Sequence, residues 1–182
     1  MFDRLPHTHR TSRLVLRPLA SRDGASVVEH MSDFETARML ARVPSPYTLE
    51  DFDQFLAYTQ TGEEQVWAIT HATGCALLGC IGLLPMKGGA VRVGFWLGAP
   101  HRRQGIMKET LTAVLEIAFK QGAEKVYAGY FDDNHPSRDL QLSFGFVPGA
   151  RALEFCMATG KKRPHTDTFL CAGKFESCYP DG

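Results

Sequence analysis

The sequence predicts a mixed α/β domain in which helices pack against one mostly antiparallel sheet. Three strand-like segments joined by tight turns occupy residues 65–71, 76–85 and 90–97, and turns of this kind join antiparallel neighbours. An amphipathic helix signal follows over residues 105–120, with further helix and strand signals on both sides of it. We therefore expect a twisted sheet of about seven strands with helices on both faces.

The size and composition of the chain fit one globular domain. It has 182 residues, of which 44% are hydrophobic and 22% are charged, and a chain of this length buries enough surface to fold without disulfides or metals. No linker, repeat or low-complexity segment interrupts it. We expect a single domain over residues 1–182, with its core at about residues 11–172.

Charge and cysteine content exclude several classes of protein. Twenty Lys and Arg balance 20 Asp and Glu, which argues against a nucleic-acid partner but allows a local basic pocket for a phosphate. No apolar run approaches a membrane helix, and the N-terminus lacks the apolar core of a secretion signal. The five scattered cysteines form no CxxC pair, so we expect free thiols, no metal site and a cytoplasmic monomer or homodimer.

The first quarter of the chain predicts a strand followed by helices. Residues 11–18 alternate apolar and polar side chains, as a half-buried strand does. Ser21 is the expected cap of the next helix, and a short helix is expected over residues 34–41. Thr48 and Asp51 form an approximate capping box for a helix that reaches about residue 61.

The last third of the chain predicts three strands and a short helix. The strands are expected over residues 125–131, about 146–157 and 166–172. The helix is expected over residues 136–144, with a proline in its first turn. We expect the tail from residue 173 to be loose.

The loop before the long helix is basic and contains a glycine. A helix N-terminus offers unpaired N–H groups and positive dipole charge, and both favour a pyrophosphate. Arg102 and Arg103 add charge, and Gly105 lets the backbone approach a ligand. From these residues alone, an ordinary strand-to-helix loop with solvated arginines is equally compatible.

A second polar cluster, residues 132–137, follows the strand at 125–131. In a structural interpretation, Asn134 caps the next helix and Ser137 is a polar residue of its first turn. In a functional interpretation, this amide and this hydroxyl lie at a strand end where a cofactor and an amine meet.

These segments resemble the GNAT superfamily of N-acetyltransferases. Residues 102–107, Arg-Arg-Gln-Gly-Ile-Met, are similar to its Arg/Gln-x-x-Gly-x-Gly/Ala loop. Residues 134–137 with 142–146 resemble the Asn-x-x-Ser…Gly-Phe stretch of the RimJ/RimL branch, whose members acetylate protein N-termini, notably of ribosomal proteins. Residues 11–18 and 167–170 also match that branch.

The resemblance implies the GNAT fold and an acetyl-CoA-dependent N-acetyltransferase. Acetyl-CoA would lie where two parallel strands, here residues 90–97 and 125–131, splay apart. A primary amine, either a protein N-terminus or a small molecule, would attack the thioester directly, with no covalent enzyme intermediate and no metal.

The resemblance also assigns roles to individual residues. Ser137 stands where the family places the proton donor to the departing thiolate, and Asn134 would hold cofactor or ordered water. The implied acetyl-CoA-binding set is Phe95, Trp96, Leu97, Arg102, Arg103, Gln104, Gly105, Ile106, Met107 and Asn134.

Three positions depart from the family pattern. The family often carries Gly at Arg103 and prefers Gly or Ala at Met107. Arg92 stands where many relatives place a strand Glu, and an arginine is no base at neutral pH. Arg92 is equally compatible with binding an acidic substrate group and with a plain surface position. The sequence does not choose among the possible replacements for that Glu, which are Asp132, Asp133, Glu154 and His165.

The departures leave two other functions open, a CoA-binding GNAT-fold protein without turnover and a partner-binding module that uses no CoA. In the enzymatic interpretation, we expect the acceptor cleft between the helices of residues 21–61 and the turn at 159–164, because loops carry specificity.

Overall fold

The computed structural model describes residues 5–178, with side chains placed through residue 175. The strands are β1 His9–Arg10, β2 Leu14–Pro18, β3 Gln65–His71, β4 Leu77–Pro85, β5 Ala90–Leu97, β6 Lys125–Phe131, β7 Val147–Cys156 and β8 Lys161–Cys171. The helices are α1 Gly24–Ser32, α2 Phe34–Ala37, α3 Leu49–Thr59, α4 Ile106–Lys120, α5 His135–Ser143 and α6 Ala172–Cys178.

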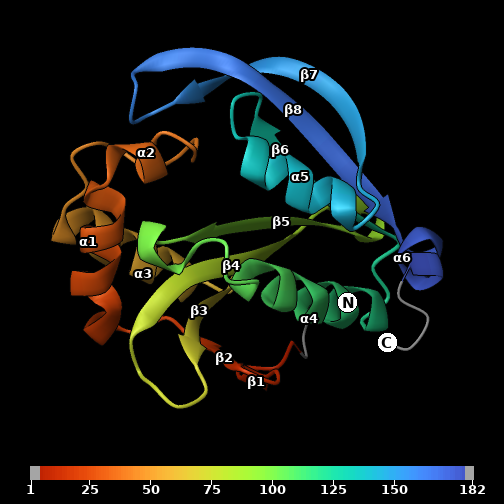
Figure 1. Cartoon of the computed structure of the whole chain (residues 1–182), viewed down its shortest axis with the longest axis horizontal. Coiled ribbons are helices and arrows are strands. Elements are labelled where there is room, and N and C mark those ends of the chain that lie inside the picture. Colours follow the sequence, from red (N-terminus) through yellow and green to blue (C-terminus); the bar gives the residue numbers. More distant parts are fainter. Residues whose placement is uncertain (1–4, 179–182) are drawn as a thin grey trace.

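The described strands form one eight-stranded sheet in the order β1-β2-β3-β4-β5-β6-β8-β7 (Figure 1). The expected count of about seven omitted β1, a two-residue strand that pairs with β2. Every neighbouring pair is antiparallel except β5 and β6, which are parallel. The predicted mixed, mostly antiparallel sheet is therefore confirmed.

Helices cover both faces of the sheet, as predicted, because alternate strand residues point to opposite faces. Trp67 of β3 packs in a core cluster with α4, while its neighbour Ala68 packs in a second cluster with α1 and α3. We call these surfaces the α4 face and the α1/α3 face. The α4 face also carries α5, whose Leu140 packs against the first cluster.

The helix starts show which local signals hold. The capping box is confirmed, since the Asp51 N–H donates to Thr48 Oγ1 at 3.3 Å and the Thr48 N–H donates to Asp51 Oδ2 at 2.8 Å. Ser21 is not the cap of α1, because residues 21–23 form a 3₁₀ turn in which Arg17 binds the Asp23 carboxylate at 2.7 Å. The short helix α2 ends at Ala37, four residues before its expected end.

The C-terminal part differs most from expectation. The tail predicted to be loose forms α6, because Phe175 is 4% exposed and its ring lies 5.2 Å from that of Phe119. β8 starts at Lys161, five residues early, and pairs with β7 as a long hairpin. Figure 1 shows this hairpin arching toward α2, where the Met157 N–H donates to the Ala41 carbonyl at 3.0 Å.

Cysteines, metal ligands and apolar helices can be checked over the described residues. Cys75, Cys80, Cys156 and Cys171 are free thiols, whereas the side chain of Cys178 lies outside the described part. No described cluster of three His, Cys, Asp or Glu side chains has the arrangement of a metal site. No helix within residues 5–178 has both the length and the apolar character needed to cross a membrane.

Candidate active site at the splayed strands

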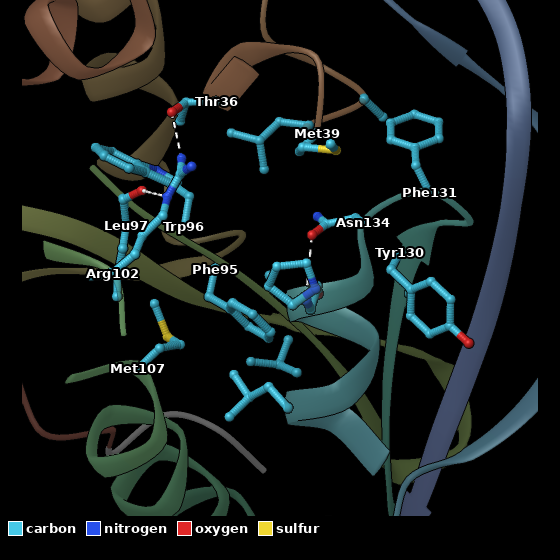
Figure 2. Close-up of a pocket in the computed structure, with 18 of the residues that line it drawn as sticks. Thr36, Met39, Phe95, Trp96, Leu97, Arg102, Met107, Tyr130, Phe131 and Asn134 are labelled. Atoms are coloured by element: carbon cyan, nitrogen blue, oxygen red, sulfur yellow. Dashed lines mark hydrogen bonds between the residues drawn. The ribbon is translucent and has the colours of Figure 1, made fainter. Parts of the chain in front are cut away.

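The site opens where β5 and β6 part. Their parallel register ends at Arg92 and Tyr127, whereas β5 stays paired with β4 as far as Leu97. The edge of β5 that faces β6 therefore has no ladder partner beyond Arg92, and its backbone is free to pair with an extended ligand. A cavity of about 600 Å³ fills the gap, and side chains from β5, α4 and α5 surround it in Figure 2.

The structure brings nearly all of the predicted site residues together. The cavity is lined by Phe95, Trp96, Leu97, Arg102, Arg103, Gly105, Ile106, Met107, Asn134 and Ser137. Gln104 is the exception, because its amide Nε2 folds back to the Pro100 carbonyl at 2.9 Å. The gathering supports the functional interpretation of both polar clusters.

The loop before α4 presents backbone N–H groups to the cavity. Gly105 caps α4 with φ of 75°, and the first intrahelical bond runs from Glu109 N to Gly105 O at 3.0 Å. The preceding N–H groups have no helical acceptor, and they carry the positive end of the helix dipole. Arg103 has φ of 59°, so glycine, the family's common residue there, fits this conformation with less strain.

The arginines of this loop differ in their partners. Arg102 Nε donates to the Leu97 carbonyl at 3.2 Å, and Nη2 of the same guanidinium donates to Thr36 Oγ1 (Figure 2). Arg102 thus joins the end of β5 to α2. Arg103 is exposed and has no hydrogen-bond partner within residues 5–175, so its charge is available to an anion at the helix N-terminus.

Met107 both packs in the core and borders the cavity. Its side chain is 7% exposed and belongs to the cluster on the α4 face, while it also lines the cavity next to Ile106. The Met107 side chain therefore turns into the core at the position where the family prefers Gly or Ala.

A carboxylate on α4 fastens the turn between β1 and β2, residues 11–13, to the loop before α4. Glu109 accepts hydrogen bonds from Thr11 Oγ1 at 2.5 Å, Ser12 Oγ at 3.1 Å, Arg13 N at 2.9 Å and Arg13 Nε at 2.6 Å. Burial raises the pKa of Glu109, but these bonds outweigh it and lower the pKa to about 2. Arg13 Nη1 also donates to the Gln104 carbonyl at 3.2 Å, so this cluster, which the sequence did not reveal, supports the loop.

Asn134 and Ser137 take the positions of the structural interpretation, and both side chains also line the cavity. Asn134 Oδ1 caps α5 by accepting the Ser137 N–H at 3.3 Å. Gln141 Nε2 donates to Ser137 Oγ at 3.0 Å, and Gln141 Oε1 accepts the buried Thr168 hydroxyl at 2.6 Å. Because Ser137 Oγ accepts from Gln141, its own proton is free for a group in the cavity. Gln141 was missed, although its position four residues after Ser137 on one helix is a usable signal.

Arg92 is neither a free cation nor a plain surface residue. Its Nη1 lies 3.1 Å from Asp167 Oδ1 on β8, and both side chains are partly exposed, at 37% and 40%. Arg92 also lines the cavity. The strand position that carries a carboxylate in many relatives is therefore occupied by an ion pair.

Two of the four candidate replacement bases are held by cations. Hydrogen bonds from Thr166 and Arg151 lower the pKa of Asp132. Burial raises the pKa of Asp133, but Arg38 at 2.8 Å and Arg163 at 2.6 Å lower it further than burial raises it. Carboxylates held in this way are poor proton acceptors near pH 7.

The other two candidates differ in their position. Glu154 is exposed on the edge strand β7 and does not line the cavity. His165 of β8 does line it, with its ring edge-to-face on Phe131 at 5.6 Å. A further carboxylate, Glu64 from the turn before β3, also lines the cavity. The cavity is also bordered by residues 35–36 and 39–42, which belong to the 21–61 region where the acceptor cleft is expected, whereas no residue of the turn at 159–164 lines it.

Comparison with known families supports this geometry. Residues 13–147 match the model of the acetyltransferase (GNAT) domain. No curated protein matches the chain in sequence.

Solved structures show the same fold. A protein of T. thermophilus assigned as an acetyltransferase is 21% identical, with 97% of this chain and 95% of that chain covered and a TM-score of 0.85. The microcin self-immunity acetyltransferase MccE, solved in complex with acetyl-CoA and AMP, is 14% identical, with coverages of 88% and 93% and a TM-score of 0.76. A ribosomal-protein alanine acetyltransferase from Vibrio fischeri is 17% identical, with coverages of 90% and 96% and a TM-score of 0.74.

Proposed function

Since this chain belongs to the GNAT acetyltransferase family, we propose that it transfers the acetyl group of acetyl-CoA to a primary amine, either a protein N-terminus or a small molecule. The observation that carries the proposal is the unpaired edge of β5 beyond Arg92, with a helix N-terminus at one end and Ser137 beside it. The acceptor class of the RimJ/RimL branch is supported by the Asn134-to-Ser137 spacing and by the fold of the Vibrio fischeri enzyme.

The residues present fit a pantetheine diphosphate. The backbone of Phe95 faces the unpaired edge of β5, and the N–H groups before Glu109 with the Arg103 guanidinium suit the diphosphate. The Leu97 carbonyl already accepts from Arg102, which leaves the Phe95 backbone for a strand-like contact with the pantetheine. When bound, acetyl-CoA supplies an activated thioester.

Proton transfers at the reacting centre fall to the chain's own side chains. Gln141 holds the Ser137 oxygen, so the hydroxyl proton points away from Gln141 and can pass to the departing sulfur. The Asn134 side-chain oxygen accepts the helix-capping hydrogen bond, which leaves the amide N–H groups of Asn134 to orient a ligand or water at the cavity wall.

The test is CoA release with a panel of amines: small primary amines, amino acids, polyamines and peptides with free N-termini. We expect wild-type turnover with at least one class. Ser137→Ala should lower kcat by about tenfold or more, since general-acid help gives roughly 10²–10⁴ in rate. Its Kd for acetyl-CoA should stay within about twofold. Full kcat in Ser137→Ala would show that a water is the donor.

A CoA-binding protein without turnover is the second candidate, and the Arg92–Asp167 ion pair at the usual carboxylate position favours it. The two functions separate in the same experiment. A thermal shift by acetyl-CoA with no CoA release for any amine would establish the second candidate and exclude the first.

A further inference from the structure

Three glycines lie on the neighbouring strands β4, β5 and β6, on the α1/α3 face of the sheet. Gly82 of β4 is the cross-strand partner of Gly94 of β5. Gly94 lies two residues beyond Arg92, and Gly129 of β6 lies two residues beyond Tyr127, the pair at which the β5–β6 register ends. Successive residues alternate faces, so the three glycines look to the same side as the Arg92–Asp167 pair.

The groups above these glycines define an open position. A Cβ at Gly82 would lie under 3.0 Å from Glu64 Oε1, and a Cβ at Gly129 would lie under 3.0 Å from the His165 ring. A Cβ at Gly94, between them, would meet nothing within 4 Å. A carboxylate and an imidazole therefore flank an empty place over Gly94, and all three residues line the cavity.

The Glu64 carboxylate is held by one oxygen and free at the other. The Tyr58 hydroxyl of α3 donates to Glu64 Oε2 at 3.2 Å. Oε1, the atom above Gly82, accepts no hydrogen bond from the described residues. Burial and the charge of Glu64 raise the pKa of Tyr58, so the phenol stays protonated as a donor. A carboxylate oxygen without a donor at a cavity wall suits a cationic ligand atom.

We infer that Glu64 is the group that binds the acceptor's ammonium and takes its proton, in place of the carboxylate that Arg92 replaces. This inference rests on the proposed acetyltransferase function. It names the acceptor as an amine that is protonated at neutral pH. Glu64 extends over the neighbouring strand β4 toward the open position above Gly94, because Gly82 has no side chain that would exclude it.

The proton and electron balance of the step is complete. The acceptor enters as R–NH₃⁺, and one proton passes from its nitrogen to Glu64 Oε1, directly or through one water. The freed electron pair forms the C–N bond to the acetyl carbon while the C–S bond breaks. The leaving sulfur takes the Ser137 hydroxyl proton, Ser137 recovers the second proton lost by nitrogen, and Glu64 releases its proton to solvent.

Several titratable groups lie around Glu64. Tyr58 comes from α3, Arg42 from the segment after α2, and Glu63 adjoins Glu64 in the chain; the charges of Glu64, Arg42 and Glu63 all act on the Tyr58 phenol. β4 contributes Gly82, next to Glu64 Oε1, and Leu84, which lines the cavity, and neither residue is titratable. The remaining titratable groups of this part of the cavity are Glu35, Arg92 and His165, with Asp167 paired to Arg92.

The test compares the pH profiles of Glu64→Gln and a matched control, Glu63→Gln. Glu63 is exposed on the same turn, outside the cavity, and its variant makes the same change in net charge. At pH 7 we expect kcat/KM of Glu64→Gln to fall by about 10²–10⁴ and that of Glu63→Gln to stay within about twofold. The Glu64→Gln loss should shrink as the pH approaches the pKa of the amine, and it should be smaller for amines of lower pKa.

Two measurements keep a folding defect apart from a lost base. The melting temperature and the thermal shift with acetyl-CoA should be unchanged in Glu64→Gln. Gly82→Ala retains the carboxylate but displaces it, since the new Cβ conflicts with Glu64 Oε1 and lies 3.3 Å from Val66 Cγ2. We expect Gly82→Ala to lower kcat/KM while acetyl-CoA still produces its thermal shift.

The outcomes separate this inference from the function on which it rests. No CoA release by the wild type with any amine would overturn both. Turnover in the wild type with an unchanged Glu64→Gln profile would overturn this inference alone, as would a loss independent of pH and of amine pKa. A pH-dependent loss in His165→Gln but not in Glu64→Gln would move the role to the imidazole.

Discussion

Replacing Glu109 by Gln should lower the stability of the protein in a pH-dependent way. The four hydrogen bonds to its carboxylate lower the pKa from an ordinary 4.5 to about 2. A shift of this size corresponds to about 3 kcal/mol, at about 1.4 kcal/mol per pKa unit. Glu109 is 17% exposed but its partner Arg13 is 53% exposed, and solvent screening reduces the expected loss to about 2 kcal/mol.

The sign of the effect follows from the lowered pKa of Glu109. Its stabilisation is complete above pH 4.5, the pKa of an unfolded glutamate, and disappears as the pH falls toward 2. Chemical denaturation at pH 7 should therefore give a free energy of unfolding about 2 kcal/mol lower for Glu109→Gln, with a melting temperature lower by about 4–8 °C. Near pH 2 the wild type and the variant should converge.

The control for this prediction is another glutamate of α4. Glu116 makes only a 3.8 Å surface pair with Lys120, so Glu116→Gln should change stability by less than about 0.5 kcal/mol. Glu109→Gln should also weaken acetyl-CoA binding, because Arg13 then loses the anchor that holds it against the Gln104 carbonyl. An equal loss of stability at pH 7 and pH 2 would refute the electrostatic reasoning.

Three further predictions test the loop, the serine network and a helix cap. Gly105→Val should abolish the thermal shift with acetyl-CoA, because the φ of 75° at this position suits glycine. At a hundredfold excess of acetyl-CoA over Kd, the lost shift corresponds to about 2.7 kcal/mol of stabilisation. A retained shift would show that the diphosphate binds elsewhere. Gln141→Leu leaves the buried Thr168 hydroxyl without its acceptor and removes the hydrogen bond to Ser137. The free energy of unfolding should therefore fall by about 1–3 kcal/mol, and kcat should fall with the Kd for acetyl-CoA unchanged. A normal kcat would exclude a positioning role for Gln141. Thr48→Ala should lower the free energy of unfolding by about 1 kcal/mol, measured by denaturation, without altering acetyl-CoA binding, measured by calorimetry. An unchanged free energy of unfolding would show that the capping box does not stabilise the protein.

The fold could be predicted where local signals and burial agree. The helix over residues 105–120 was predicted within one residue, because its apolar side chains recur at helical spacing and Gly122 follows it. In the β7–β8 hairpin, β7 was predicted within one residue at each end, although nine of its ten residues are exposed, whereas β8 starts five residues before its expected start. The helix α6 was missed because it depends on the buried contact of Phe175 with Phe119, and the local sequence pattern does not predict that contact.

The candidate site residues could likewise be predicted only where they are close together in the sequence. The residues of the loop and of α5 were found because they are close in sequence and fall in recognisable motifs. Glu109 was missed because its partners Thr11 and Arg13 lie 98 and 96 residues away in the chain. The role proposed for Glu64 could not be predicted from the sequence, because the position of its carboxylate depends on Gly82 in another strand. A glycine inside a strand is a signal of close approach, but it does not say which side chain approaches.

The roles proposed for Ser137 and Glu64 require the strands β5 and β6 to splay. Ser137 lies on α5, whose Gln141 binds Thr168 on the α4 face of the sheet, whereas Glu64 lies over Gly82 on the α1/α3 face. A closed sheet would separate a proton donor on one face from a proton acceptor on the other by its hydrogen-bonded backbone. Because β5 and β6 part beyond Arg92 and Tyr127, a thioester lying between them is open to both faces at once. In the proposed mechanism, the amine would lose one proton to Glu64 on one side while the sulfur gains one from Ser137 on the other, so no side chain needs to cross the sheet.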